Sequence, residues 1–383
     1  MKLIPYNRPY VNENTVNYLK KVMLSRHYSG GGQFTKLCES WISDRTKPYK
    51  GYLTNSCTAA LEIAAIALDG EIGDEIIMPS YTFVSTANAF VLNGYVPVFV
   101  DIRQDTLNID ENKIESAITT RTKAIVCVHY AGVACEMEKI LFIARKYGLL
   151  VIEDAAQGFM SKYDTSLLGC IGDIGAYSFH DTKNITAGEG GCILAKNKDL
   201  IEKIEVIKEK GTNRKQLLNG EVDKYTWVSK GSSYVMPELS AALLLSQLEN
   251  AEMITSRRIE LWNNYHQLIK PLEEKGYLKR PALNLKNQHN AHIYFIILEN
   301  NLNRNNILRE MKRMNVLASF HYIPLHLSKV TKKYYKVNDE LSITERVADQ
   351  LIRLPLWHEI TADEQFKVVN TLIKAIEIEK KHK

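Results

Sequence analysis

Short apolar runs alternate with helix-like patterns from about residue 50 to about residue 200 of the chain. This alternation predicts a mostly parallel sheet of the α/β class. A helix is expected over 59–68, directly after a strand that contains Leu53. Six further runs are expected to be strands, at 75–78, 96–100, 124–129, 149–153, 176–179 and 191–194.

The clearest β-α-β unit of this region spans residues 124–154. Between its two strands, apolar side chains recur at helical spacing at Met137, Ile140, Leu141 and Ile143. Its second strand ends at Glu153 and Asp154. Open α/β sheets place their ligands at the carboxyl ends of strands, so these two acids mark the expected site.

Beyond about residue 235 the pattern becomes mainly helical. The expected elements are helices over 238–248 and 257–272, a strand over 293–298, a helix over 305–314, a strand over 316–322 and a terminal helix. Because 383 residues are too many for one compact core, we expect two domains. We predict a large domain over residues 1–250, whose N-terminal segment packs on the small one, and a small α+β domain over 251–383.

Composition narrows the class of protein. Hydrophobic residues make up 45% and charged residues 24%, which is ordinary for a soluble globular chain. The net charge of +5 is mild and its charges are interleaved, which argues against a nucleic-acid binder. The six cysteines show neither a CxxC pair nor metal-ligand spacing, so no metal site is expected. Neither a signal peptide nor a membrane-length apolar stretch is visible, which predicts a cytoplasmic protein without a membrane partner.

Two segments suit a phosphate group and a ring nitrogen. Asn55-Ser-Cys-Thr-Ala-Ala opens a helix directly after a strand, and free N–H groups beside a hydroxyl at such a place bind phosphate well. In Val151-Ile-Glu-Asp-Ala-Ala-Gln, the carboxylate of Asp154 can hold a protonated pyridine nitrogen. Taken alone, an ordinary helix cap and an ordinary acidic strand end are the simpler interpretations.

Two further segments suit a covalent bond and a stacked ring. Lys183 lies just past a strand end, beside the glycine-rich Ala187-Gly-Glu-Gly-Gly. Neighbours that depress the pKa of such a lysine allow it to form a Schiff base. Ser178 can supply another phosphate donor, and Phe83 can stack on an aromatic ring. Taken alone, a surface lysine and a core aromatic residue are the simpler interpretations.

Together the four segments favour one site. Thr58, Phe83, Asp154 and Lys183 each fall at a predicted strand end, and their order resembles the large domain of fold-type-I pyridoxal-5′-phosphate (PLP) enzymes. The strings Glu153-Asp-Ala-Ala-Gln-Gly and Ser178-Phe-His-Asp-Thr-Lys-Asn resemble the DegT/DnrJ/EryC1/StrS sugar aminotransferase family. The resemblance runs from Ile4-Pro-Tyr-Asn to Arg353-Leu-Pro-Leu.

Longer strings resemble one subgroup of that family, the dTDP-4-amino-4,6-dideoxygalactose transaminases of surface glycan synthesis. They are Met78-Pro-Ser-Tyr-Thr-Phe-Val-Ser-Thr, His129-Tyr-Ala-Gly-Val-Ala-Cys-Glu-Met, Glu209-Lys-Gly-Thr-Asn-Arg, Val222-Asp-Lys-Tyr-Thr-Trp and Phe320-His-Tyr-Ile-Pro-Leu-His. The implied reaction is transamination of dTDP-4-keto-6-deoxyglucose. Glutamate is the implied amino donor and a dTDP-4-amino-4,6-dideoxy sugar the implied product.

The resemblance also implies roles for single residues. Lys183 forms the internal aldimine and moves the proton between the substrate carbon and the cofactor. Asp154 pairs with the pyridine nitrogen, Gln157 lies near the phenolic oxygen, and Phe83 stacks on the ring. The implied phosphate ligands are Thr58, the backbone of Ala59 and Ser178.

Substrate contacts and a partner subunit are implied in the same way. The implied substrate contacts are His180, His321, His326 and Lys230, with a structural role as the alternative for the histidines. Family members are homodimers with shared active sites, in which an asparagine of the partner subunit reaches the phosphate. Ser233 stands in that place in this chain.

Three alternatives remain open. A related transaminase that acts at C3, or on a UDP- or GDP-keto-sugar, uses the same catalytic residues. A deoxysugar dehydratase of this fold is disfavoured, because that lineage has histidine in place of Lys183. A regulator with a DNA-binding extension is disfavoured, because the enzyme-like pattern begins at Ile4.

Overall fold

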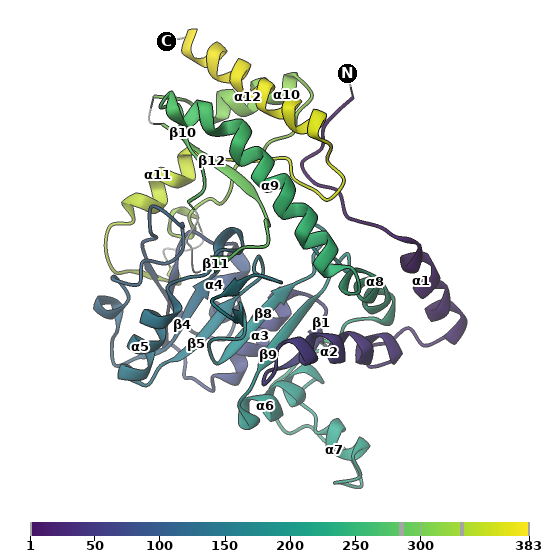
Figure 1. Cartoon of the computed structure of the whole chain (residues 1–383). Helices are drawn as coiled ribbons and strands as arrows, with labels where there is room; N and C mark the ends of the chain where they lie inside the picture. Colours follow the sequence, from purple (N-terminus) through teal and green to yellow (C-terminus); the bar gives the residue numbers. More distant parts are fainter. Residues whose placement is uncertain (1, 283–286, 300, 330–332, 382–383) are drawn as a thin grey trace.

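A computed structural model describes residues 2–282, 287–299, 301–329 and 333–381 (Figure 1). Within them, eight strands form one large sheet in the order β1-β9-β8-β5-β4-β2-β3-β13. The bounds are β1 Lys50–Thr54, β2 Glu75–Pro79, β3 Val96–Val100, β4 Thr122–Val128, β5 Leu150–Asp154, β8 Ile174–Ser178, β9 Gly191–Ala195 and β13 Lys336–Val337. Only β9 runs antiparallel to its two neighbours, so the predicted α/β class with a mostly parallel sheet is confirmed.

Helices bury both faces of this sheet. The helices of the large layer are α2 Gln33–Arg45, α3 Cys57–Ala67, α4 Val84–Val91, α5 Met137–Tyr147, α6 Lys198–Lys208 and α8 Glu238–Leu248. Along β5, Val151 packs in the core shared with α2, α5 and α8, while its neighbour Ile152 packs in the core shared with α3, α4 and α6. Successive strand residues point to opposite faces, which is why these buried strands read as continuous apolar runs.

A second layer packs around three antiparallel strands, β10 Leu278–Lys279, β12 Tyr294–Leu298 and β14 Leu351–Leu354. Its helices are α9 Ala251–Glu274, α10 Arg304–Arg313, α11 Ser342–Gln350 and α12 Ala362–Lys381. Figure 1 shows α9 leading from α8 to this layer. The N-terminal segment joins it, because Ile4 is buried in the same core and exchanges backbone hydrogen bonds with Asn315 and Leu317.

The domain boundary near residue 250 stays a prediction. Within α9, Ile254 belongs to the core of the large sheet, whereas Leu261 belongs to the core of the second layer. We propose that the two domains meet inside this helix. The later part of the chain also returns to the large sheet, since β13 pairs with β3.

The predicted strand over 316–322 is wrong. In the described residues, this stretch makes single bridges only, between Val316 and Ile4 and between Ser319 and Arg353. Asn315 has a left-handed backbone with φ of 61°, which turns the chain as it leaves α10. The apolar residues that mimic a strand instead form a loop, and residues 319–323 of that loop line a cavity.

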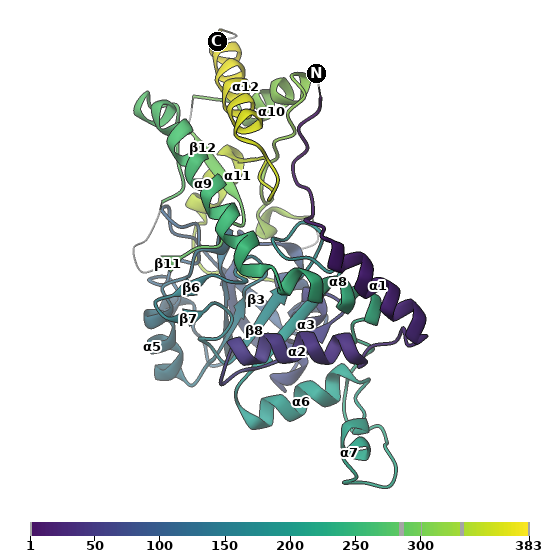
Figure 2. The same cartoon turned by 45° about the vertical axis from the view of Figure 1, so that its right-hand side comes forward.

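One segment stands away from both layers. Helix α7 (Arg214–Leu218) and its loop project from the large layer in both views (Figures 1 and 2). One further helix, α1 (Glu13–Ser25), lies near the N-terminus and, like α2, packs against α8. In the described ranges no helix has the length and apolarity needed to cross a membrane.

Candidate active site

A cavity of about 780 Å³ lies at the carboxyl ends of the central strands. Its wall combines the N-terminal turns of α3 and α4, the ends of β5 and β8, and the loop over 319–323 with the residues of β14. Five predicted cofactor residues line it, namely Thr58, Phe83, Asp154, Gln157 and Ser178, together with Lys183. Segments far apart in the sequence therefore meet in one hollow.

Lys183 lies in the turn that follows β8 and lines the cavity. Burial lowers the pKa of its amine, although the neighbouring Cys57 and Asp154 partly offset this effect. A lowered pKa increases the fraction of neutral amine, which is the nucleophilic form. Lys183 is thus placed and tuned for attack on a carbonyl carbon.

Asp154 ends β5 and its carboxylate is buried in the cavity wall. Thr86 donates a hydrogen bond to Oδ2 at 2.6 Å, and the Ala156 N–H donates to Oδ1 at 3.2 Å. Burial raises the pKa of this carboxyl group above its ordinary value. A cationic partner in the cavity would reverse that effect, because it stabilises the charged form.

Glu153 points away from this cavity and fulfils a structural role. Its carboxylate accepts hydrogen bonds from the N–H groups of Gly169, Ile171 and Gly172 at 2.6–2.7 Å. It also contacts His129 Nε2 at 2.8 Å, and His129 Nδ1 accepts from the Cys135 N–H. Because a backbone N–H can only donate, Nδ1 is unprotonated and Nε2 carries the proton that is donated to Glu153.

Replacing Glu153 with glutamine is expected to destabilise the fold by about 3 kcal/mol, because the amide would turn a donor toward buried donors. Urea denaturation of the Glu153→Gln variant measures this loss. Glu202 is an exposed acid on α6, and the Glu202→Gln variant is the control. Its midpoint of urea unfolding should equal that of the wild type. An unchanged unfolding midpoint for Glu153→Gln would contradict the structural role.

Gln157 is held by groups from both layers. Its Oε1 accepts from the Ala131 N–H at 2.7 Å, and its Nε2 donates to the Tyr322 hydroxyl at 2.8 Å. Tyr322 also lies near Phe83, with ring centroids 6.4 Å apart. Gln157 therefore lines the cavity with its amide already oriented.

The start of α3 is rich in hydroxyl groups. Ser56 caps the helix by accepting from the Ala59 N–H at 3.0 Å, so the predicted phosphate donor Ala59 is engaged in this structure. Thr58 donates to Ser85 Oγ at 2.8 Å. With Ser178, these hydroxyls surround the positive end of a helix, where an anion is stabilised.

Phe83 presents its ring to the cavity. It is the residue before α4 and its side chain is 57% exposed. The simple alternative from the sequence, an aromatic residue packed in the core, does not describe it. An exposed ring at the wall of a hollow is suited to stack on a planar ligand.

The predicted substrate histidines occupy three different positions. His180 is half-buried in the cavity wall, and its Nε2 lies 3.5 Å from Glu189. His321 lines the cavity, is stacked on Tyr322, and burial lowers its pKa. His326 is buried between Ser80 and Glu345 and is not part of the cavity wall formed by the described residues.

Lys230 and Ser233 lie outside the cavity. Neither belongs to its wall within the described parts of this chain, and both are exposed in the segment that follows α7. The Ser233 carbonyl accepts from the Asn55 side chain at 3.4 Å, close to the start of α3. Ser233 therefore lies near the start of α3 of its own chain, but outside the described cavity wall.

The comparisons with known proteins agree with this geometry. The family model described as the DegT/DnrJ/EryC1/StrS aminotransferase family matches residues 9–373. The chain belongs to this family. It is 31% identical to the spore coat polysaccharide biosynthesis protein SpsC of Bacillus subtilis over 97% of this chain and 96% of that protein.

Solved structures of sugar aminotransferases resemble the chain over nearly its whole length. The putative sugar aminotransferase Spr1654 of Streptococcus pneumoniae, in its PMP form, has a TM-score of 0.90 and 25% identity over 98% of this chain and 99% of that chain. DesI, solved in the presence of its TDP-sugar product, has a TM-score of 0.89 and 25% identity over 100% of this chain and 96% of that chain. The predicted enzyme class, a PLP-dependent sugar aminotransferase, and its cofactor are confirmed.

Three cavity residues of this aminotransferase were missed by sequence reasoning. Arg353 comes from β14, His292 precedes β12, and Tyr322 comes from the loop after Val316. Their segments are more than 100 residues from Lys183 and carry no local motif for chemistry. Only the resemblance string around Arg353 and the run Phe320-His-Tyr pointed to these stretches.

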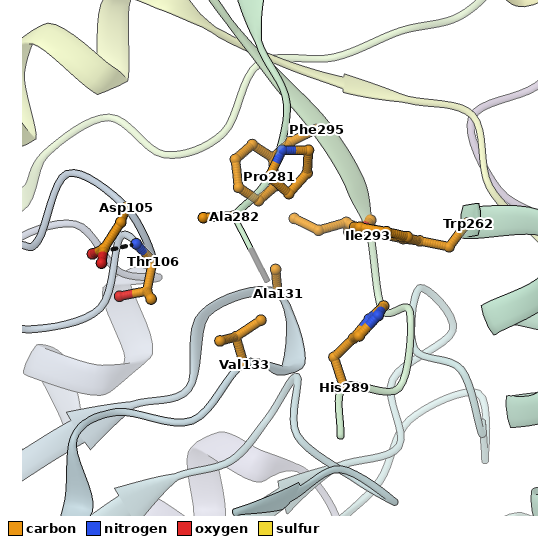
Figure 3. A pocket seen from close by; sticks show the side chains of 10 residues that line it. All are labelled: Asp105, Thr106, Ala131, Val133, Trp262, Pro281, Ala282, His289, Ile293 and Phe295. Atoms are coloured by element: carbon orange, nitrogen blue, oxygen red, sulfur yellow. Dashed lines mark hydrogen bonds between the residues drawn. The ribbon is translucent and has the colours of Figure 1, made fainter. Parts of the chain in front are cut away.

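A second hollow of the aminotransferase is too small for a cofactor. Trp262, His289 and Phe295 line it, and its volume is about 10 Å³, which holds about one water molecule (Figure 3). Across the described ranges, no cluster of three or more His, Cys, Asp or Glu side chains could hold a metal ion. The cavity around Lys183 and Asp154 is accordingly the candidate active site.

Proposed function

We propose that the chain transfers the amino group of glutamate to C4 of dTDP-4-keto-6-deoxyglucose, giving a dTDP-4-amino-4,6-dideoxy sugar for a surface glycan. The observation that carries this proposal is the meeting of Lys183, Asp154 and Arg353 in one cavity of about 780 Å³. DesI, a structural relative, was solved with its TDP-sugar product, and SpsC is named for polysaccharide biosynthesis. Both support a nucleotide-sugar substrate.

The residues present fit PLP. The buried Asp154 carboxylate, whose pKa is raised by burial, is a partner for a protonated ring nitrogen. The hydroxyls at the start of α3 suit the phosphate, and the exposed Phe83 ring suits the pyridine face. When bound, the cofactor supplies an electron sink for the charge that develops at the substrate carbon.

The chain's own side chains would perform the remaining work. Lys183 holds the cofactor and, when free, its amine takes the proton from the substrate carbon. Asp154 would keep the ring nitrogen charged, and Gln157, whose amide is fixed by Ala131 and Tyr322, would contact the ring's phenolic oxygen. His321 and His180 also line the cavity and would contact the sugar.

Arg353 suits a carboxylate of the amino donor. Its Nε donates to the Phe320 carbonyl at 3.2 Å and its guanidinium lies 4.7 Å from the Tyr6 ring centroid, so the side chain is oriented within the cavity wall. A guanidinium binds a carboxylate through charge-assisted and often paired hydrogen bonds. Glutamate would therefore enter with its carboxylate toward β14.

Replacing Arg353 with methionine is expected to raise the KM for glutamate roughly 10- to 100-fold, because a hydrogen bond between charged groups is lost. The KM for the keto-sugar should change far less. Steady-state kinetics with each substrate varied separately measures both values. Arg304→Met is the matched control, since Arg304 lies over the Phe320 ring but outside the cavity wall of the described residues. Equal rises in both KM values would contradict the assignment.

The working unit is proposed to be a homodimer with shared active sites. The projecting segment carries apolar side chains in solvent, with Leu218, Tyr225 and Trp227 exposed and Trp227 78% exposed. Such exposed aromatic groups favour burial against a partner. Ser233 and Lys230 follow in the same segment and would reach the partner's phosphate and nucleotide.

Mixing two inactive chains tests this arrangement. One chain carries Lys183→Ala and the other carries Ser233→Ala with Trp227→Ala. If the sites are shared, heterodimers should regain one complete site and at most half of the wild-type activity per dimer. Activity of mixtures after proven subunit exchange is the measurement. Absence of recovery would assign the segment to the site of its own chain.

A panel of keto-sugars with glutamate as donor tests the proposed substrate. The dTDP-4-keto-6-deoxy sugar should be converted, with the new amine at C4 by NMR and product mass. Preferred conversion of a UDP- or GDP-keto-sugar, or amination at C3, would favour the alternative transaminases. These outcomes leave the enzyme class untouched and revise only the substrate.

A further inference from the structure

The residue after Lys183 joins the lysine turn to a distant segment. Asn184 is 8% exposed, and its Nδ2 donates to the Asn290 carbonyl at 2.8 Å. Its Oδ1 lies 3.1 Å from His292 Nδ1. Both partners belong to the short segment that precedes β12, more than 100 residues along the chain. One buried side chain thus bridges the turn after β8 and the segment over 290–292.

Chemistry fixes the orientation of every group in this bridge. A carbonyl oxygen can only accept, so the Asn184 atom facing Asn290 must be the amide nitrogen. The Asn184 oxygen therefore faces His292 and can only accept from it. His292 Nδ1 must carry a proton, and since burial lowers the pKa of this histidine, its other ring nitrogen is unprotonated.

The segment over 290–292 is itself held in place. Asn290 Nδ2 donates to the carbonyls of Gln157 and Phe159, each at 2.8 Å. The buried Arg258 donates to the carbonyls of Ala291 and His292 at 3.1 Å and 2.7 Å. The segment over 290–292 therefore contacts both the turn that contains Gln157 and the turn that contains Lys183.

We propose that Asn184 is a positioning residue for Lys183, which clamps the lysine turn to the segment over 290–292 and holds His292 as its Nδ1–H tautomer. The inference rests on the proposed function, because it takes Lys183 as the lysine that holds the cofactor. Without the clamp, the turn is attached to the second layer less firmly, and the lysine nitrogen gains contact with water.

The protonation state of the Lys183 side-chain nitrogen shows whether the clamp holds the lysine turn in place. The ionisable groups that face this nitrogen are Cys57, Asp154, His292, His321 and Arg353, which come from five separate parts of the fold. Burial is the largest influence on Lys183 and disfavours its charged form. Release of the turn should therefore raise the pKa of the lysine nitrogen. This holds for the free amine and also for the imine nitrogen that the lysine would form with the cofactor.

The test is a pH titration of the visible cofactor band of the holoenzyme. In Asn184→Ala the midpoint should move upward by about one unit, because a more hydrated lysine nitrogen holds its proton more readily. Asn108→Ala is the matched control. Asn108 is also buried and bridges loop segments through Val133 and Ala134, without contact to the lysine turn. It should lose stability but keep the wild-type midpoint.

A second pair of variants tests the histidine. In His292→Asn, the amide nitrogen lies as many bonds from the backbone as Nδ1 and can still donate to Asn184. This variant should keep a midpoint near that of the wild type, whereas His292→Leu should shift it as Asn184→Ala does. If Asn184→Ala does not fold, comparison of His292→Asn with His292→Leu is sufficient to test the proposal.

The outcomes separate the clamp from the proposed function. A wild-type midpoint in Asn184→Ala, with borohydride labelling still on Lys183, overturns the clamp alone. Equal shifts in His292→Asn and His292→Leu overturn it too, since the Nδ1 hydrogen bond would then not matter. Borohydride labelling of a different lysine overturns both the clamp and the assignment of Lys183.

Discussion

The Lys183→Ala variant is expected to lose all measurable turnover and the site of covalent labelling. In the proposed function its amine is both the nucleophile that holds the cofactor and the base that moves the substrate proton, so one substitution removes two functions. The wild-type protein should show a visible cofactor band, and borohydride should fix the cofactor to Lys183. Peptide mapping by mass spectrometry identifies the labelled residue.

Lys162→Ala serves as the control for this experiment. Lys162 lies in the short strand β6 (Lys162–Tyr163), outside the cavity wall of the described residues, and its loss should leave labelling and turnover unchanged. A label on Lys162, or on any lysine other than Lys183, would contradict the assignment of the active site.

The Asp154→Asn variant is expected to fold and bind cofactor but to lose turnover on the order of 10³-fold. An amide cannot keep the ring nitrogen charged, so the developing negative charge at the substrate carbon is less well stabilised. Thr86 and the Ala156 N–H can still contact the side chain, which is why folding should survive. Single-turnover kinetics and the unfolding midpoint measure the two effects separately.

Glu153 provides the contrast for this experiment. It neighbours Asp154 on β5, yet its carboxylate is enclosed by the 169–172 turn and His129. Glu153→Gln should therefore lose stability, and Asp154→Asn should lose catalysis. Near-normal turnover in Asp154→Asn would show that another acid holds the ring nitrogen.

The buried strands of the large sheet could be predicted because both of their faces are covered, whereas the exposed edge strand β13 was not predicted. Residues 96–100 were predicted as a strand and form β3, since every side chain in such a run is apolar or small. Glycines and polar residues bound these runs, which fixes their ends. The candidate cofactor residues followed, because parallel strands bring their carboxyl ends to one edge.

The remaining parts of the site could not be predicted from local patterns. Residues 316–322 are mostly apolar, but in the described ranges they make only single bridges, to Ile4 and Arg353, and they form a cavity loop instead of a strand. Arg353 belongs to β14 and looks like an ordinary edge residue. Asn184 and His292 are brought together only by the packing of the two layers.

The most direct test of the central claim follows the nitrogen itself. The purified enzyme is incubated with ¹⁵N-glutamate and dTDP-4-keto-6-deoxyglucose, and the sugar product is examined by NMR and mass spectrometry. The proposed function predicts ¹⁵N bonded to the sugar carbon that carried the keto group, with 2-oxoglutarate formed in equal amount. Recovery of the keto-sugar unchanged, or of a sugar product without ¹⁵N, would contradict it.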